Sequence, residues 1–203
     1  MNKKTAFLLM SLAHTLTGTN IETERLILQQ WQEKNIQDFL EIMQNPAVNE
    51  PISFHGFNAR EKIEAIALKA NASIAEKEFG YFACLKKDSQ ECIGLVGLNY
   101  IDRQESPFPC FTVSYILSAE HWGNGYAHEA VKALFKLAFE TLNIKEVYAC
   151  TTALNKKSQQ VMERAEMHYV ETFDFPGIDK SAPYCQHVLY KITQQEWKEP
   201  RTR

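Results

Sequence analysis

The hydrophobic positions of the chain repeat with two different periods, which predicts a mixture of helices and strands. One run has the three- and four-residue spacing of a helix face: Ile36, Phe39, Leu40 and Met43. Asn45-Pro46 should end this helix, because proline lacks an N–H and disfavours a helical conformation in the residue before it. We expect a loop over residues 47–57 and a second helix from Asn58, an N-cap residue with Glu61 as its capping-box partner.

The rest of the chain alternates short apolar runs, typical of strands, with longer amphipathic stretches. Strands are expected at 25–28, 81–85, 92–100, 111–117, 146–152, 169–173 and 186–192, the second and third forming a hairpin through the polar turn 86–91. Helices are expected at 126–142 and 156–165, and loops at 107–109 and 174–183. This order favours an α+β (α/β three-layer) fold, with a mixed central sheet flanked by helices rather than a pure βαβ repeat.

The composition fits one globular domain. The 203 residues are 45% hydrophobic and 23% charged, which excludes an intrinsically disordered chain and allows a buried core. With 22 Lys and Arg against 25 Asp and Glu, the net charge is -3, so the chain lacks the basic balance of a dedicated nucleic-acid-binding protein. We see no internal repeat or low-complexity linker, and we expect no nucleic-acid partner.

The cysteines and the first residues indicate the compartment. The five cysteines are odd in number and form no C-x-x-C pair, which argues against a disulfide framework or zinc site and favours a reducing cytoplasm. Residues 1–13 combine two lysines with a short apolar run, as a signal peptide does, but Ser11 and His14 interrupt the run and no small-x-small cleavage site follows. A bilayer span needs ~20 residues. We therefore interpret residues 1–21 as an N-terminal extension and expect no membrane partner.

Residues 115–130 are the segment with the clearest potential for chemistry. A strand ends, a turn with Gly123 and Gly125 follows, and an amphipathic helix begins near residue 126. Glycine tolerates positive φ and lets another molecule approach the backbone, while the first N–H groups of the helix point unpaired into the turn. With the helix dipole they form an anion site suited to phosphate. Many glycine-rich turns nevertheless bind nothing, and this one is neither a Walker loop nor the three-glycine dinucleotide fingerprint.

Five short phrases occur in an order typical of one family: residues 23–28 (TERLIL), 93–97 (IGLVG), 122–127 (WGNGYA), 155–158 (NKKS) and 187–190 (HVLY). The third resembles the acetyl-CoA loop of the GNAT N-acetyltransferase superfamily, Gln/Arg-x-x-Gly-x-Gly/Ala, with Trp122 where Gln or Arg is usual. Its longer form, W-G-x-G-Y-A-x-E-A, is similar to the branch that includes the ribosomal-protein alanine N-acetyltransferases. The resemblance implies one GNAT domain over residues 22–197, followed by a tail at 198–203.

The resemblance also implies how acetyl-CoA binds. The strand before the loop would diverge from the next one, and backbone groups of Ile116, Leu117 and Ser118 would follow the pantetheine arm in the gap. A main-chain N–H near Leu117 would stabilise the oxyanion of the tetrahedral intermediate, an effect worth ~3 kcal/mol. The loop would hold the pyrophosphate through Gly123, Asn124, Gly125, Tyr126 and Ala127, with Trp122 as a further residue of the cofactor site, and Asn155 would reach the pantetheine. Lys156 or Lys157 could meet the nucleotide phosphates, although a solvated face is the commoner role of such a pair.

The catalytic groups match the family less well. Relatives in this branch often carry a Glu general base three residues before the strand tyrosine, where this chain has Thr112, and many place a Tyr acid where it has Met162. Ser158 stands where some relatives use serine to protonate the leaving thiolate, although a serine there also fits a capping or solvated residue. Three routes stay open: a base acting through water, catalysis by positioning, which can recover ~7–11 kcal/mol of barrier, or reduced activity.

Several other polar residues are weaker candidates. His187 and Tyr190 have a strand spacing that would turn one to the core and the other to the cleft. Glu129 fits a first-turn acid favoured by the helix dipole. Glu166 stands where the family usually has Gly and would cost ~1 kcal/mol if the site needs positive φ. The acceptor pocket could be shaped by His55, Glu50 and Tyr100, although a loop histidine is more often simply exposed.

The leading hypothesis is an acetyl-CoA-dependent N-acetyltransferase, in which a primary amine of a protein N-terminus or small molecule attacks acetyl-CoA directly in a ternary complex. Two alternatives stay open: a GNAT-fold CoA-binding protein with little catalysis, acting as a sensor or partner-binding module, and a nucleotide-binding protein that uses the same glycine loop. The first is motivated by the missing carboxylate at Thr112. We expect no metal and a cytoplasmic monomer or homodimer.

Overall fold

The computed structural model describes residues 20–50, 60–102 and 107–199, which form two compact units. Unit 1 comprises the chain up to Gly97 together with Tyr115–Tyr126. Unit 2 comprises Leu98–Ser114 together with the chain from Ala127 onward. Two strands, β4 (Cys92–Ile101) and β5 (Cys110–Leu117), pass from one unit into the other. Within the described ranges, no helix has the length and hydropathy that a membrane span requires.

Unit 1 is built on a sheet whose strands follow one another in chain order, β1-β2-β3-β4-β5, with antiparallel pairing from β1 to β4. Its first three strands are β1 (Ile21–Glu22), β2 (Leu26–Gln29) and β3 (Tyr81–Lys86). The pairing places Ile27 opposite Leu85 and Ala83 opposite Leu95. The predicted hairpin of the second and third apolar runs is therefore confirmed as β3 and β4.

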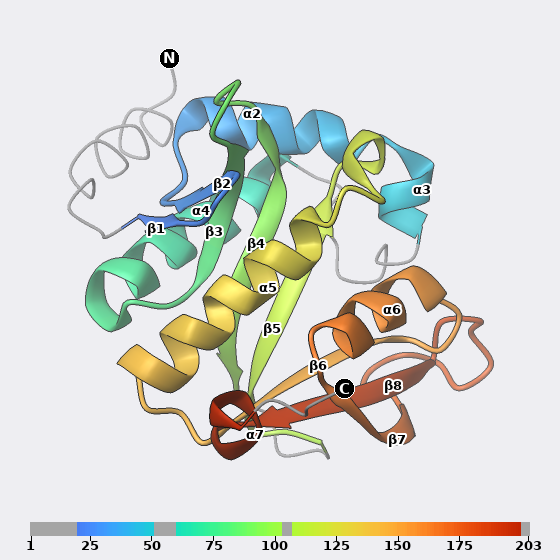
Figure 1. The fold of residues 1–203 in the computed structure, drawn as a ribbon. Coiled ribbons are helices and arrows are strands. Elements are labelled where there is room, and N and C mark those ends of the chain that lie inside the picture. The colour runs from blue at the N-terminus through green and yellow to red at the C-terminus, as the bar shows by residue number, and fades with distance from the viewer. Residues whose placement is uncertain (1–19, 51–59, 103–106, 200–203) are drawn as a thin grey trace. The chain divides into compact units, whose positions relative to one another are not determined.

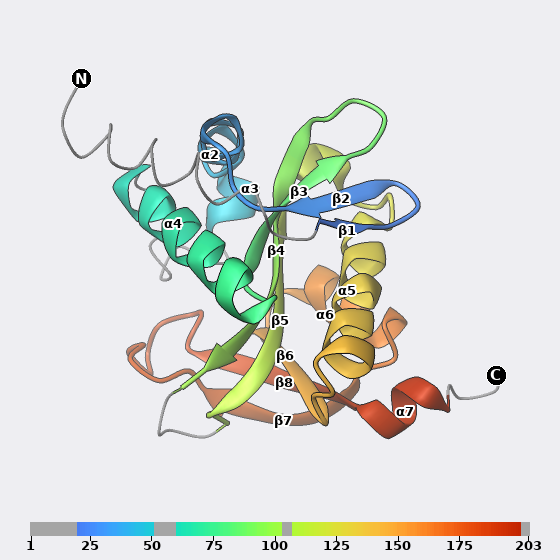
Figure 2. The ribbon, with the colours of Figure 1, turned by 90° about the vertical axis from the view of Figure 1, so that its left-hand side faces the viewer.

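Helices pack on this sheet through a hydrophobic core that includes Trp31. They are α2 (Glu33–Ile42), α3 (Pro46–Asn49) and α4 (Arg60–Lys77), and Figure 2 shows α4 running beside α2 and along β3. The Trp31 indole donates to the Tyr81 carbonyl at 2.8 Å and meets the Phe39 ring edge-on at 5.5 Å. The Asn71 side chain of α4 bonds both main-chain groups of Trp31, at 2.7 and 2.9 Å. A buried amide thus ties α4 to the end of β2.

The segment after α2 differs from the expected loop. Asn45-Pro46 does separate two elements, but Pro46 also begins the short helix α3, because its missing N–H costs nothing at the first helical position. The Asn45 side chain caps this helix by accepting from Ala47 N at 3.0 Å. The predicted N-cap Asn58, the candidate His55 and residues 1–19 of the predicted extension (1–21) lie outside the described residues.

Unit 2 carries the mixed part of the sheet, in the order β4-β5-β6-β8-β7. Its further strands are β6 (Glu146–Thr152), β7 (His168–Asp174) and β8 (Gln186–Thr193). The β5–β6 pair is parallel, whereas β6–β8 and β7–β8 are antiparallel. Figure 1 shows this part of the sheet with α6 beside it. The expected mixed sheet flanked by helices is confirmed.

Two details of the unit 2 helices were not predicted. The helices are α5 (Tyr126–Lys136), whose first residue belongs to unit 1, α6 (Lys156–Arg164) and α7 (Gln194–Lys198). The single helix expected over 126–142 changes to π geometry at Leu137–Thr141. The helix α7 follows the last strand, and its Trp197 packs against Phe135 and Phe139 at ring distances of 6.0 and 6.1 Å. The C-terminal segment is therefore anchored by aromatic packing.

The cysteines and Glu166 behave as the sequence indicates. All five cysteines are free and four of them are buried, so none forms a disulfide. Glu166 follows α6 and has φ +68°, the left-handed conformation that favours glycine, and its carboxylate pairs with Lys132 at 3.0 Å. The strained site that the sequence suggested at Glu166 is therefore present.

Candidate acetyl-CoA site

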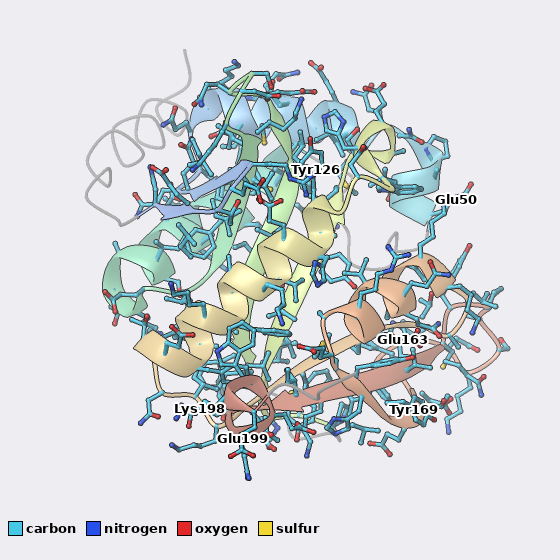
Figure 3. All side chains as sticks on the ribbon, viewed as in Figure 1. Glu50, Tyr126, Glu163, Tyr169, Lys198 and Glu199 are labelled. Carbon is cyan, nitrogen blue, oxygen red and sulfur yellow. The ribbon has the colours of Figure 1, made fainter. Side chains whose placement is uncertain are left out.

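The predicted glycine turn lies in unit 1, between the end of β5 at Leu117 and the start of α5. A short 3-10 turn, η2 (Ala119–His121), fills the first part of the connection. Gly123 and Gly125 have φ +81° and +82°, and both residues are exposed. Figure 3 labels Tyr126 where α5 begins. Two glycines in the left-handed region thus lie immediately before a helix N-terminus, the geometry that the anion-site argument requires.

Trp122 anchors the turn to the end of β5. Its indole N–H donates to the Leu117 carbonyl at 2.9 Å, and its ring packs against the hydrophobic core of unit 1. The indole donor is therefore committed to the protein's own backbone. Where Gln or Arg is usual in the family, the partly buried Trp122 ring thus links the turn to the core of unit 1.

The end of β5 is held close to β4 at Gly94. A Cβ placed on Gly94 would overlap the carbonyl oxygen of Ile116 and lie 2.9 Å from the Leu117 Cα. One residue further on, Ser118 N–H donates to the Ile93 carbonyl at 2.9 Å, and the Ser118 carbonyl accepts from His121 N at 3.0 Å. Both main-chain groups of Ser118 are thus bonded inside unit 1, which leaves its hydroxyl as the group that could reach a ligand.

Asn155 and Ser158, the candidates of unit 2, lie at the start of α6. Asn155 is the N-cap, and its Oδ1 accepts from Ser158 N at 3.1 Å. This bond orients the Asn155 amide and leaves its NH₂ group as the donor for a ligand. The neighbouring Lys156 is exposed and its Nζ donates to Gln159 Oε1 at 3.3 Å. That contact favours the solvated-face interpretation of the lysine pair.

The β5–β6 pairing in unit 2 is short. Among the described residues the two strands pair only at Thr112, opposite Tyr148, although β6 continues to Thr152. The hydroxyls of Thr112 and Thr152 are buried and have no hydrogen-bond partner in the described part of the chain. A ladder this short agrees with the divergence of strands that the family resemblance implies.

The two usual proton-transfer groups are missing, as the sequence indicates. Thr112 is 3% exposed and Met162 is 2% exposed, so each side chain packs inside unit 2. Neither a hydroxyl of ordinary acidity nor a thioether can act as a base near neutral pH. Ser158, half-buried at the third position of α6, is the remaining candidate among the residues that match the family.

His187 and Tyr190 face opposite sides of β8, and both are buried. His187 Nδ1 lies 3.1 Å from the Cys185 carbonyl, which can only accept, so this nitrogen carries the proton. The ring lies 5.9 Å from Phe173 and 4.6 Å from Phe175. Burial lowers the pKa of His187, and the Cys185 bond opposes this only in part.

The Tyr190 hydroxyl donates a hydrogen bond of 3.0 Å to Glu163, which Figure 3 labels. The side chains of His187 and Tyr190 are both buried, so neither is exposed to solvent as the expected division between core and cleft would suggest.

Sequence analysis missed a surface pocket of about 260 Å³ in unit 2. It is lined by Tyr100, Pro109, Cys110, Phe111, Ile144, Lys145, Glu146 and Tyr148. Burial, aided by a 2.8 Å bond to Glu146, raises the pKa of Tyr148 to about 12, so the phenol stays protonated. Tyr100, an expected pocket residue, is 48% exposed, and its ring packs against Phe111 in a tilted arrangement with 5.0 Å between the ring centres. The pocket combines residues of three strands, which no sequence spacing could indicate.

Comparison with known proteins decides the family. Residues 25–168 match the family model described as the acetyltransferase (GNAT) domain. The chain belongs to the GNAT acetyltransferase family. The match includes the glycine turn, Asn155 and Ser158, and it ends before His187.

Individual relatives agree with the GNAT assignment. The FsC-acetyl coenzyme A-N(2)-transacetylase of Aspergillus fumigatus is 27% identical over 184 residues, covering 87% of this chain and 77% of that protein. A GNAT-family acetyltransferase structure from Bacillus anthracis has a TM-score of 0.72 at 18% identity, covering 88% of this chain and 100% of that one. The ribosomal-protein-S5-alanine acetyltransferase of Vibrio fischeri has a TM-score of 0.69 at 20% identity, covering 88% and 98%. At these identities the two structures establish the fold.

The GNAT assignment also establishes the class of reaction. The protein is an acetyl-CoA-dependent acyltransferase, as its family and its named relatives are. In the described residues, no group of three His, Cys, Asp or Glu side chains is arranged to hold a metal ion.

Proposed function

We propose that the protein transfers the acetyl group of acetyl-CoA to a primary amine, by direct attack of the neutral amine in a ternary complex. The observation that carries the proposal is the exposed turn at Gly123 and Gly125, with two positive φ values directly before α5, inside the matched GNAT domain. The A. fumigatus relative supports a nitrogen acceptor, because its name specifies acetyl coenzyme A and N(2). We also propose that the GNAT domain spans residues 22–197.

In unit 1, the main-chain N–H groups of the turn would bind the pyrophosphate. The turn contains no Lys or Arg, so backbone dipoles must supply most of the attraction. The N–H near Leu117 would donate to the thioester oxygen as the tetrahedral intermediate forms, and Ile116 would follow the pantetheine arm. Trp122 would contribute to acetyl-CoA binding by supporting the backbone of the turn, and Ser118 would contribute its hydroxyl as a hydrogen-bonding group.

In unit 2, Asn155 would donate its NH₂ group to the pantetheine, and Ser158 would protonate the leaving thiolate. The N-cap bond from Ser158 N to Asn155 Oδ1 supports this assignment, because it holds both side chains at one end of α6. As the C–S bond breaks, the thiolate sulfur takes a proton from the Ser158 hydroxyl, and the proton released by the attacking amine returns through water to the Ser158 oxygen.

The acceptor is tested by measuring free thiol released from acetyl-CoA against small primary amines and N-terminal peptides. Turnover with either class supports the proposal and identifies that class. Tight CoA binding without turnover on any acceptor would contradict it in favour of a CoA-binding module. A larger thermal shift with ATP or NAD than with CoA would point to a nucleotide-binding protein, since the preferred ligand raises the melting temperature by mass action. Cytoplasmic location and a monomeric or homodimeric state stay predictions, the first supported by the five free cysteines.

A further inference from the structure

The side chain of Arg25 lies against the glycine turn in unit 1. Its Nη1 donates to the Asn124 carbonyl at 3.0 Å. Its guanidinium carbon lies 4.6 Å from the centre of the Tyr126 ring, a cation–π contact. Its Nη2 lies 3.5 Å from the position that a Cβ on Gly125 would occupy. One guanidinium therefore contacts Asn124, 99 positions away in sequence, and Tyr126, on either side of Gly125.

The backbone beneath Arg25 is fixed on both sides. Leu26 N donates to Thr23 Oγ1 at 2.8 Å, and Thr23 N donates to the Leu26 carbonyl at 3.0 Å, which closes a tight turn around Arg25. The Arg25 carbonyl accepts from Lys87 N at 2.8 Å. The TERL phrase thus builds a rigid base from which the arginine reaches the turn.

The turn needs such support, because Gly123 and Gly125 flank Asn124, and glycine lets the backbone of the turn adopt many conformations. Some of its contacts are local: Asn124 Nδ2 donates to the carbonyls of His121 and Trp122, at 3.2 and 3.3 Å. Arg25 adds a long-range contact. It also brings a permanent positive charge beside N–H groups that have no basic side chain among themselves.

We propose that Arg25 is a positioning residue for acetyl-CoA, which holds the turn at residues 124–126 in its anion-binding conformation and adds positive charge beside it. This inference rests on the proposed function of the turn as the pyrophosphate site. Arginine suits the role because its planar guanidinium group can donate to a carbonyl while its face packs on an aromatic ring, whereas the lysine ammonium cannot do both.

The test measures acetyl-CoA affinity by calorimetry and steady-state kinetics for the wild type, Arg25→Gln and Arg25→Lys. Arg25→Gln should raise the KM for acetyl-CoA roughly tenfold, a factor that corresponds to ~1.4 kcal/mol, with kcat and the acceptor KM unchanged. It should also weaken the dependence of affinity on salt, because an exposed charge is screened by ions. Arg25→Lys should restore the salt dependence but not the full affinity.

Two further variants make the result specific. Lys87→Gln removes a neighbouring positive charge that pairs with Glu22 at 3.0 Å, and it should leave the KM for acetyl-CoA within about twofold of wild type. Tyr126→Leu removes the stacked ring but keeps the Arg25–Asn124 bond, so it should weaken acetyl-CoA binding less than Arg25→Gln does. This variant keeps the inference testable if Arg25→Gln unfolds, which a denaturation midpoint would reveal.

Three outcomes would count against the inference in different ways. Unchanged acetyl-CoA affinity in both Arg25→Gln and Tyr126→Leu would overturn it. Full recovery of affinity in Arg25→Lys would show that charge alone matters and would overturn the positioning role. A wild-type protein that binds no acetyl-CoA would overturn the proposed function itself, and this inference with it.

Discussion

Gly94 in β4 lies so close to Ile116 in β5 that a Cβ on Gly94 would collide with the Ile116 carbonyl oxygen. The Gly94 backbone also has φ +151°, a value that side chains disfavour. This contact lies inside unit 1, on the part of β5 that we propose to follow the pantetheine arm. Glycine at position 94 is therefore required both by its own conformation and by its neighbour.

Gly94→Ala should consequently destabilise the protein by about 2–4 kcal/mol, because overpacking against a backbone atom adds to the strain of the positive φ. Urea denaturation measures the change. Gly123→Ala is the matched control: it keeps a positive φ of +81° but has no described atom within 4 Å of the new Cβ. Its cost should be only ~1 kcal/mol. Equal losses in the two variants would contradict the close approach.

Gly125→Val should abolish CoA binding while leaving the fold largely intact. A β-branched side chain is disfavoured at φ +82°, and it would meet the Arg25 guanidinium, 3.5 Å from the new Cβ. Gly177→Val provides a control with a similar φ of +84° in the 174–183 loop of unit 2. Calorimetric titration with CoA compares the two. Wild-type affinity in Gly125→Val would show that the turn does not bind CoA.

Ser158→Ala should lower kcat about 100-fold with little change in the KM for acetyl-CoA, since a positioned general acid contributes typically 10²–10⁴-fold. The N-cap bond to Asn155 should survive, because it uses the backbone N of Ser158. Gln160→Ala, an exposed position of the same helix, serves as the control. If thiol release is as fast in Ser158→Ala as in that control, Ser158 is only a structural residue.

The stability of the protein should fall as the pH decreases below about 6.5, in part because of His187. Burial holds the folded-state pKa of His187 below its usual 6.5, so the unfolded chain binds its proton first. The free energy of unfolding then decreases as pH falls from 6.5 to the lowered pKa, and this contribution is constant below it. His187→Asn should reduce the dependence of the free energy of unfolding on pH, while keeping a donor for the Cys185 carbonyl. Denaturation measured from pH 5 to 7 tests this: if the free energy of unfolding changes equally with pH in both proteins, His187 makes no such contribution.

Glu166→Gly should stabilise the protein by about 0.5–1 kcal/mol. Glycine relieves the strain at φ +68°, and the exposed ion pair with Lys132 that is lost contributes little. Glu166→Ala separates the two effects, because it keeps the strain and loses the ion pair, and it should be neutral or slightly destabilising. The measurement is the midpoint of thermal unfolding. A lower midpoint for Glu166→Gly than for Glu166→Ala would refute the argument from backbone strain.

Much of the fold could be predicted because its signals are local. The periods of apolar residues located most helices and strands, and the glycines at 123 and 125 predicted a turn of positive φ. The strain at Glu166 was suggested by the family resemblance, since the family usually has glycine at that position. Where local signals were weak, the expectations failed: α3 and α7 are too short to show a period, and the π turn at Leu137–Thr141 has the same apolar face as a helix.

The sequence by itself thus predicted the family through five short phrases, and it located the glycine turn and the missing carboxylate at Thr112, since each of these signals depends on residues close together in the chain. Only the tertiary structure decided how the turn is held: by Trp122 on Leu117, by Gly94 against Ile116, and by Arg25 on Asn124. The last contact joins residues 99 positions apart. A contact of that kind depends on which strands become neighbours, and strand order follows from burial of the whole core rather than from any local pattern.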